Sequence, residues 1–66
     1  TDEENDADVL VVYDDSVSAK ELTAAVQQLS EENSSVAVLK CIPANGRYGK
    51  IYRMTERGLE SIERDN

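Results

Sequence analysis

The sequence contains no histidine and only one cysteine, Cys41, among its 66 residues. Without histidine, a Cys-His nucleophile cannot form, and a thiol has no evident cause for a low pKa. A single cysteine also cannot form an intrachain disulfide. A chain of this size buries only about 60% of its unfolded surface. Its core is therefore small, and neither of the usual supports of small domains, a disulfide or a metal, is at hand.

Long apolar runs are missing as well. The two apolar stretches, Val9 to Val12 and Val36 to Ile42, have the length of strands. Neither is long enough for a signal peptide or a membrane span. We therefore expect a cytoplasmic protein that makes no membrane contact.

Basic residues are scarce, and their distribution is uneven. The net charge is −7, and residues 1–40 hold ten acids and two bases, whereas residues 41–66 hold four acids and five bases. Such an acidic chain disfavours non-specific binding to nucleic-acid phosphates, which depends on clustered Lys and Arg. A local basic site in the second half is still compatible with this composition.

The residues that are present indicate one domain with a polar leader. Thr1 to Asp8 holds five acids and is expected to be a flexible acidic leader. Residues 9–66 then form a single small α/β domain, a fragment or terminal domain of a larger protein. Val9 to Tyr13 is a continuous, mostly β-branched run, typical of a central parallel strand that is covered on both faces.

A helix and a second strand follow. The segment Ser18-Ala19-Lys20-Glu21 matches a capping box, which predicts a helix from Ala19 to about Glu32. Its apolar residues recur with helical period; they are Leu22, Ala25, Val26 and Leu29. Val36 to Ile42 reads as a second strand, so that strand, helix and strand predict a right-handed βαβ unit.

The second half of the chain predicts a hairpin. Pro43-Ala44-Asn45-Gly46 has the composition of a tight reversal, after which Lys50 to Met54 forms a third strand, antiparallel to the second and near a sheet edge. Two alternatives stay open for residues 55 to 63: a short helix capped by Thr55, or a turn followed by an edge strand. The expected fold class is α/β, a three-layer-type βαβ unit plus hairpin with a mixed three- to four-stranded sheet and one or two helices.

Two candidate sites lie in the first half and centre. Asp14 and Asp15 follow the first strand, where α/β folds place ligands, and a carboxylate pair there could hold Mg²⁺. The alternative is that Asp14 caps a turn and Asp15 complements the helix dipole. Cys41 is interpreted as an inert core residue of the second strand, with a half-exposed, oxidisable thiol beside Lys40 as the alternative. We predict no catalytic residue, no cofactor and no enzymatic activity.

Bases and aromatics gather in a segment that we call the basic-aromatic segment. It comprises Arg47, Tyr48, Lys50, Tyr52, Arg53 and Arg57. Interleaved bases and aromatics can grip phosphates and stack on nucleobases, or dock an acidic protein partner. The alternative is an edge strand that its charges protect against aggregation. With β alternation, Arg47, Ile51 and Arg53 share one face, and Tyr48, Lys50, Tyr52 and Met54 share the other.

The segments Asp8 to Tyr13, Glu21 to Leu29 and Val36 to Val38 together resemble the opening βαβ of a known domain. This is the C-terminal anticodon-binding-like domain of class II, histidyl-type synthetases, in particular of the ATP phosphoribosyltransferase regulatory subunit. The resemblance implies a non-catalytic regulatory domain in histidine biosynthesis, whose partner is another protein, a domain of its parent protein or a second copy in a homo-oligomer.

A second resemblance supports an alternative function. Tyr48 to Gly58 is similar to the wing of winged-helix regulators, which implies a module that binds tRNA or DNA through the basic-aromatic segment. The acid-rich first half favours a protein partner over nucleic acid.

Overall fold

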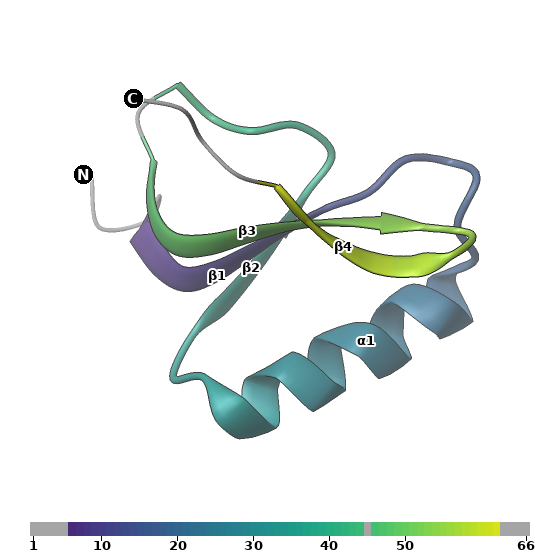
Figure 1. Ribbon diagram of the computed structural model, residues 1–66, viewed down its shortest axis with the longest axis horizontal. Coiled ribbons are helices and arrows are strands. Elements are labelled where there is room, and N and C mark those ends of the chain that lie inside the picture. The colour runs from purple at the N-terminus through teal and green to yellow at the C-terminus, as the bar shows by residue number, and fades with distance from the viewer. Residues whose placement is uncertain (1–5, 45, 63–66) are drawn as a thin grey trace.

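The chain folds into one helix and a four-stranded mixed sheet, seen in a computed structural model that describes residues 6–44 and 46–62. The elements are β1 (Asp6–Val12), α1 (Ala19–Glu32), β2 (Val36–Leu39), β3 (Arg47–Thr55) and β4 (Gly58–Ile62). The strand order is β2-β1-β3-β4, with β2 and β3 parallel to β1 and β4 antiparallel to β3. The predicted α/β class, with a βαβ unit and a hairpin, is confirmed (Figure 1).

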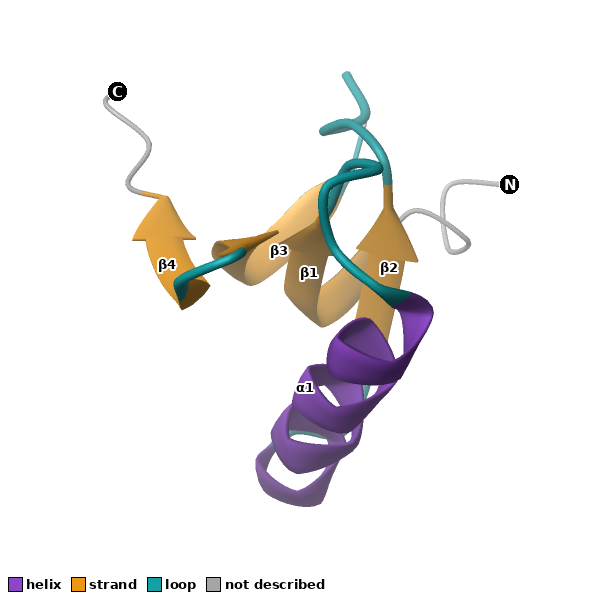
Figure 2. Cartoon of the chain, turned by 90° about the vertical axis from the view of Figure 1, so that its right-hand side faces the viewer, coloured by secondary structure: helices purple, strands orange, loops and turns teal. Residues whose placement is uncertain are grey.

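β1 is the centre of the core, as its continuous apolar run predicts. Val9, Leu10 and Val11 are completely buried. Val9 and Val11 belong to the cluster that packs under α1, and alternation turns Leu10 to the other face. Figures 1 and 2 show α1 on one side of the sheet and the loop that joins β2 to β3 on the other. The uncharged run from Val9 to Val12 is stable in this strand because both faces of the sheet are covered there.

α1 has the predicted bounds, and its ends are closed by side chains. The Ser18 hydroxyl accepts a hydrogen bond from the Glu21 backbone N–H at 3.2 Å, and it lies 3.4 Å from Glu21 Oε1. At the other end, the backbone and side-chain amides of Asn33 both donate to the Leu29 carbonyl at 3.0 Å. Leu22, Ala25 and Leu29 pack against the core, yet no residue of α1 is fully buried.

The chain does not reverse after β2, so the predicted hairpin at this point and the antiparallel third strand are wrong. β2 ends at Leu39 and not at Ile42, and β3 begins after seven further residues at the opposite end of the sheet, where Arg47 pairs with Asp6. Seven residues span roughly 23 Å when extended, about the length of β1. This arrangement stabilises the core, because Ile51, which is 3% exposed, pairs with the buried Leu10. β3 consequently lies inside the sheet and not near its edge.

Gly46 does not provide the tight turn that was expected of it, and Asn45 lies outside the described residues. Positive φ is found instead at Gly58, at 108°. This glycine closes the hairpin between β3 and β4, in which Glu56 and Arg57 form the turn. Gly46 has a different role, because a Cβ atom there would collide with the Tyr48 ring.

The open question about residues 55 to 63 is decided in favour of the edge strand for the described part. The Thr55 hydroxyl donates to the Gly58 carbonyl at 3.3 Å and accepts from the Arg57 backbone N–H at 3.1 Å. Thr55 therefore braces a turn and does not cap a helix. The reason is that the register pairs Met54 with Leu59, and both contribute to the apolar cluster under the sheet.

β1 begins earlier than expected. Asp6, Ala7 and Asp8, which the sequence assigns to the leader, belong to this strand, and the rest of the predicted leader, residues 1–5, lies outside the described residues. Asp8 ties β1 to the start of β2, since its Oδ2 accepts from the Ser34 N–H at 3.1 Å and its own N–H donates to Ser35 Oγ at 3.0 Å. Within the described ranges, no helix is long and apolar enough to cross a membrane.

Candidate functional site

The three parallel strands end at the same edge of the sheet, and polar residues follow each of them. Residues from all three strand ends line a cavity of about 170 Å³, the inner cleft; they are Val12, Tyr13, Asp14, Lys40, Arg53 and Met54. From β1 the chain passes first to β2 on one side of β1 and then to β3 on its other side. In open α/β sheets, ligands bind beyond the carboxyl ends of the strands at such a point of reversal.

Asp14 and Asp15 contact different partners in the structure. Asp14 Oδ1 accepts hydrogen bonds from the Ser16 hydroxyl and from the Ser16 backbone N–H, the latter at 2.9 Å. Asp15 Oδ1 lies 3.3 Å from Lys40 Nζ. The turn-capping alternative for Asp14 is therefore confirmed. Across residues 6–44 and 46–62, no three acidic or thiol side chains cluster closely enough to hold a metal ion.

The Asp14 carboxylate is held in its charged form. The hydrogen bonds from the Ser16 hydroxyl and the Ser16 N–H, with a smaller effect of the nearby Arg53 charge, lower the pKa of Asp14 below its ordinary value of 3.8. Both bonds from Ser16 go to Oδ1. The second oxygen, Oδ2, accepts no hydrogen bond from the described part of the protein and is open to a ligand.

Lys40 is the residue that connects β2 to this edge. Besides its ion pair with Asp15, its Nζ lies 6.0 Å from the centroid of the Tyr13 ring, at the limit of a cation–π contact. The ion pair is highly exposed, with side chains 64% and 94% accessible. Such surface pairs contribute only about 0–1 kcal/mol, so Lys40 can turn from Asp15 to a ligand at little cost.

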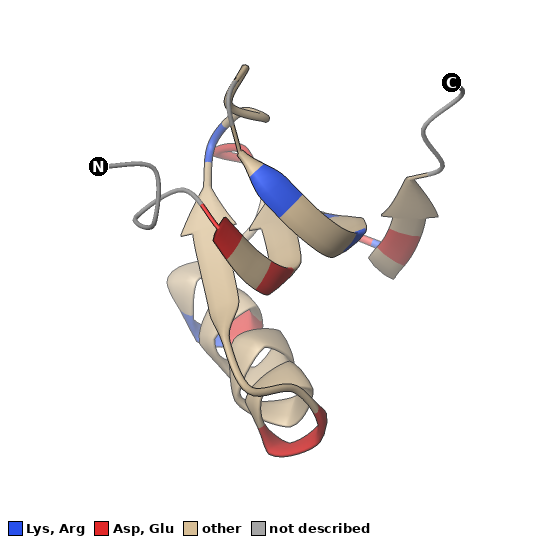
Figure 3. Ribbon diagram, turned by 90° about the vertical axis from the view of Figure 1, so that its left-hand side faces the viewer, with Lys and Arg blue, Asp and Glu red and all other residues tan. Residues whose placement is uncertain are grey.

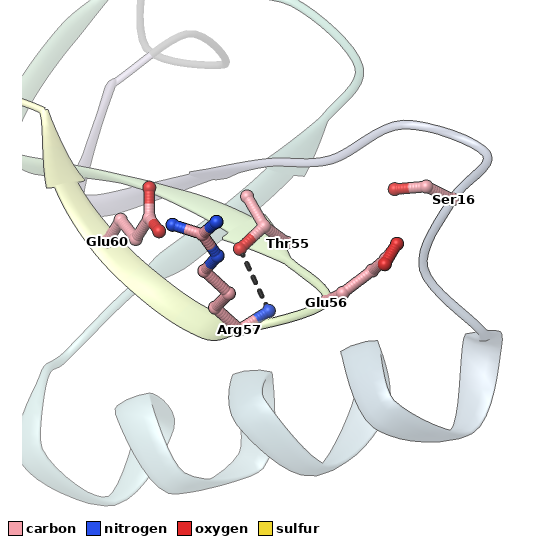
Figure 4. A pocket seen from close by; sticks show the side chains of 5 residues that line it. All are labelled: Ser16, Thr55, Glu56, Arg57 and Glu60. Carbon is pink, nitrogen blue, oxygen red and sulfur yellow. Dashed lines mark hydrogen bonds between the residues drawn. The ribbon is translucent and has the colours of Figure 1, made fainter.

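Arg53 comes from β3 and also lines the inner cleft. Its register partner on β4 is Glu60. Beside it lies a second, wider depression, the outer depression, lined by Ser16, Thr55, Glu56, Arg57 and Glu60. Figure 4 shows the Arg57 side chain pointing toward Glu60, and Ser16 facing Glu56 from the loop between β1 and α1. The outer depression is thus open and of mixed charge.

The structure does not gather the basic-aromatic segment into one surface. β3 is nine residues long, and Arg47 stands at its first residue, beside Asp6 of β1, whereas Arg57 lies in the turn beyond its other end. Alternation places Lys50 and Arg53 on opposite faces. Acidic residues lie among these bases in Figure 3. Only Arg53 and Arg57 reach the two depressions at the carboxyl edge.

The tyrosines of the segment are partly covered and do not form a stacking platform. Tyr52 packs against the apolar cluster under α1. Tyr48 is half-buried beside Gly46, and its hydroxyl is buried without a hydrogen-bond partner in the described part of the chain. Base stacking requires an exposed ring face, which neither residue offers in full.

Cys41 lies on the surface and not in the core. It follows β2 in the loop to β3, and its thiol is free and exposed, so its interpretation as an inert core residue is wrong. Its neighbours Leu39 and Ile42 are 38% and 39% exposed, the large apolar residues that the described surface leaves most accessible. The sequence predicted that the strand continues to Ile42, because Cys41 and Ile42 are apolar like the residues of β2.

Tyr13, Lys40 and Met54 belong to the inner cleft but were not singled out from the sequence. The available signal was their position at the ends of predicted strands, as for Asp14. This signal did not bring the residues together in one predicted site, because the third strand was expected beside the second strand and not beside β1. No protein-family model matches the chain, and no curated protein or solved structure is detectably similar to it. The fold and its edge define the class, a small α/β domain with a polar carboxyl edge.

Proposed function

We propose that this chain is a non-catalytic interaction domain that binds a protein partner along the open edge of β2. The proposal rests on one observation: the β2 edge is unpaired in the part of the chain that the structure describes, uncharged and partly apolar. Among the described strands, β2 pairs with β1 alone. Residues 34–39 hold no charged side chain, and Leu39 and Ile42 are exposed beside it. Sheet edges without charges or prolines are ready templates for a further strand.

The hydrogen-bonding groups of this edge can be assigned. Val9 donates to the Ser35 carbonyl and Tyr13 donates to the Leu39 carbonyl, so alternate residues of β2, Ala37 and Leu39, share the ladder with β1. The backbone groups of Val36 and Val38 therefore point outward. An extended segment of the partner would accept and donate bonds there, with its apolar side chains against Leu39.

The small core supports dependence on a partner. The five buried apolar residues all belong to β1 or β3; they are Val9, Leu10, Val11, Ile51 and Met54. Neither α1 nor β2 contributes a buried side chain. A domain of this size has little stability to spare, and a strand added to β2 would bury further apolar surface.

The resemblance to the histidyl-type regulatory subunit suggests the partner class. We infer a regulatory role in histidine biosynthesis, in the cytoplasm, through assembly with the catalytic subunit of ATP phosphoribosyltransferase. The charge of the chain agrees with a protein partner better than with nucleic acid, since its bases are dispersed and lie among acidic residues.

Sedimentation tests the proposal. We expect the chain to associate with the catalytic subunit, or with a second copy of itself, at micromolar concentration. Val38→Pro removes an outward N–H while it spares the ladder to β1, and Leu39→Lys with Ile42→Lys charges the edge. Each should weaken association at least about tenfold, the value of one net hydrogen bond or a comparable apolar contact.

The matched control is Gln27→Lys on the exposed face of α1, which should leave association unchanged. Circular dichroism of every variant confirms the fold. A chain that stays monomeric, with and without the catalytic subunit, contradicts the proposal, as does association that the charged edge leaves intact.

A further inference from the structure

The inner cleft combines charges of both signs around a small space. A carboxylate, Asp14, stands on one side, and two cations, Lys40 and Arg53, come from the neighbouring strand ends. Asp15, which pairs with Lys40, adds a second negative charge, so that two carboxylates balance the two basic side chains. A polyanion such as a nucleotide phosphate would meet two carboxylates here, and a simple cation would meet two bases.

The groups that face the cleft are available for binding. Both bonds from Ser16 are made to Asp14 Oδ1, and no residue in the described part of the chain donates to Oδ2. Lys40 is held by its exposed ion pair and by its distant contact with the Tyr13 ring. Arg53 is exposed and makes no ion pair with any residue that the structure describes. Asp14 and Arg53, which carry opposite charges, line the same cleft.

The size of the cleft limits the ligand. Its volume of about 170 Å³ is below the range of roughly 300–1,000 Å³ that is usual for sites of drug-sized ligands and cofactors. The remaining walls are apolar or aromatic, from Val12, Tyr13 and Met54. The ligand must therefore be small, carry both charges and present a short apolar part.

We propose that the inner cleft binds a free α-amino acid with an apolar side chain, its ammonium group on Asp14 and its carboxylate between Lys40 and Arg53. The ligand displaces Lys40 from Asp15, and its side chain lies against Tyr13 and Met54. Charge-assisted hydrogen bonds are among the stronger ones in proteins, and the ligand makes them at both ends, from its ammonium group to Asp14 and from Arg53 to its carboxylate. The inference does not depend on the partner that β2 binds.

Backbone amide shifts in an NMR titration of the chain with L-leucine test this. We expect saturable shifts centred on Tyr13, Asp14, Lys40 and Arg53. N-acetyl-leucine, which lacks the ammonium group, and leucinamide, which lacks the carboxylate, should bind at least about tenfold more weakly, the cost of one lost charge-assisted bond. Inorganic phosphate should not compete with leucine.

The variants Arg53→Gln and Asp14→Asn should each weaken leucine binding about tenfold or more by the same reasoning. Arg47→Gln, at the other end of β3, is the matched control and should bind as the unmodified chain does. The Lys40→Gln variant changes an exposed side chain and is not expected to disturb folding. It therefore tests the same cleft if Arg53→Gln or Asp14→Asn unfolds.

Equal binding of leucine and N-acetyl-leucine would overturn the proposal and indicate a simple anion site. The absence of shifts in the inner cleft with each of the twenty amino acids at millimolar concentration would overturn it as well. Neither result bears on association through β2, which is measured separately by sedimentation.

Discussion

At the residue scale, the carboxyl edge depends on a few side chains that follow the strands. Asp14 is the clearest case, since Ser16 holds one of its oxygens and leaves the other free. The sequence places Asp14 at the end of a strand, but it does not show which carboxylate oxygen accepts a hydrogen bond. The role of Ser16 became visible only through these bonds.

Ser16→Ala should raise the pKa of Asp14 back toward 3.8, because it removes the side-chain hydrogen bond that is the largest cause of its lowering. A carboxyl whose pKa is lower in the folded state stabilises the protein above its unfolded pKa, and this stability is lost as the pH falls through the folded value. Unfolding of the variant should therefore depend less on pH below 3.8.

Carbon-13 NMR titration of the Asp14 carboxyl measures the shift directly. Ser30→Ala in α1 serves as the control and should leave the titration unchanged. An Asp14 pKa that is the same in Ser16→Ala and in the unmodified chain would contradict the assignment.

Gly58 is the residue whose backbone requires glycine. Its φ of 108° lies in a region that costs a side-chain-bearing residue roughly 1–2 kcal/mol. Gly58→Ala should lower the free energy of unfolding by about this amount, as measured by urea denaturation. Ser61→Ala, an exposed position on the same strand, should change stability little. Equal effects of the two substitutions would exclude backbone strain as the cause.

At the scale of elements, α1 is the part that the sequence describes best. Its capping residues, its apolar period and its C-terminal Asn33 are all local features, and the structure confirms both bounds. Because no residue of α1 is fully buried, its own caps are expected to contribute much of its stability.

Ser18→Ala should destabilise the protein by about 1 kcal/mol, within the range of roughly 0.5–2 kcal/mol for lost N-caps. The cause is that the Glu21 backbone N–H loses its acceptor. Thermal or urea unfolding followed at 222 nm, the usual wavelength for helix, measures the effect. Ser30→Ala makes the same change inside α1 and should be neutral or slightly stabilising. A loss as large in Ser30→Ala would show that capping is not responsible.

β2 and β3 show the limit of element prediction. Their existence follows from their composition, but their ends do not. Cys41 and Ile42 are apolar like the residues of β2 and yet leave the sheet with Lys40, because the chain must cross β1 to place Ile51 beside Leu10.

At the scale of the whole molecule, charge is dispersed over the surface. Arg47 and Arg57 stand at opposite ends of β3, and Asp6 and Glu60 are the register partners of Arg47 and Arg53. No continuous basic surface results from the basic-aromatic segment, which argues against the nucleic-acid alternative.

Filter binding with tRNA and duplex DNA should therefore show no saturable binding at physiological salt, because few phosphates can be neutralised together. The double variant Arg47→Ala, Arg53→Ala should behave like the unmodified chain. Tight binding that falls steeply with salt and is lost in the double variant would instead support the anticodon-binding or winged-helix function.

The sequence alone determined the local parts of this protein: an apolar strand, a capped amphipathic helix with its bounds, and a second strand after it. Each of these follows from the period and composition of neighbouring residues, and their order agrees with the predicted βαβ unit. Only the tertiary structure decided that β3 lies beside β1, that β2 is an open edge, and that Asp14, Lys40 and Arg53 meet in one cleft. The physical reason is that strand pairing is non-local, and the partner is chosen by which apolar faces can be buried together.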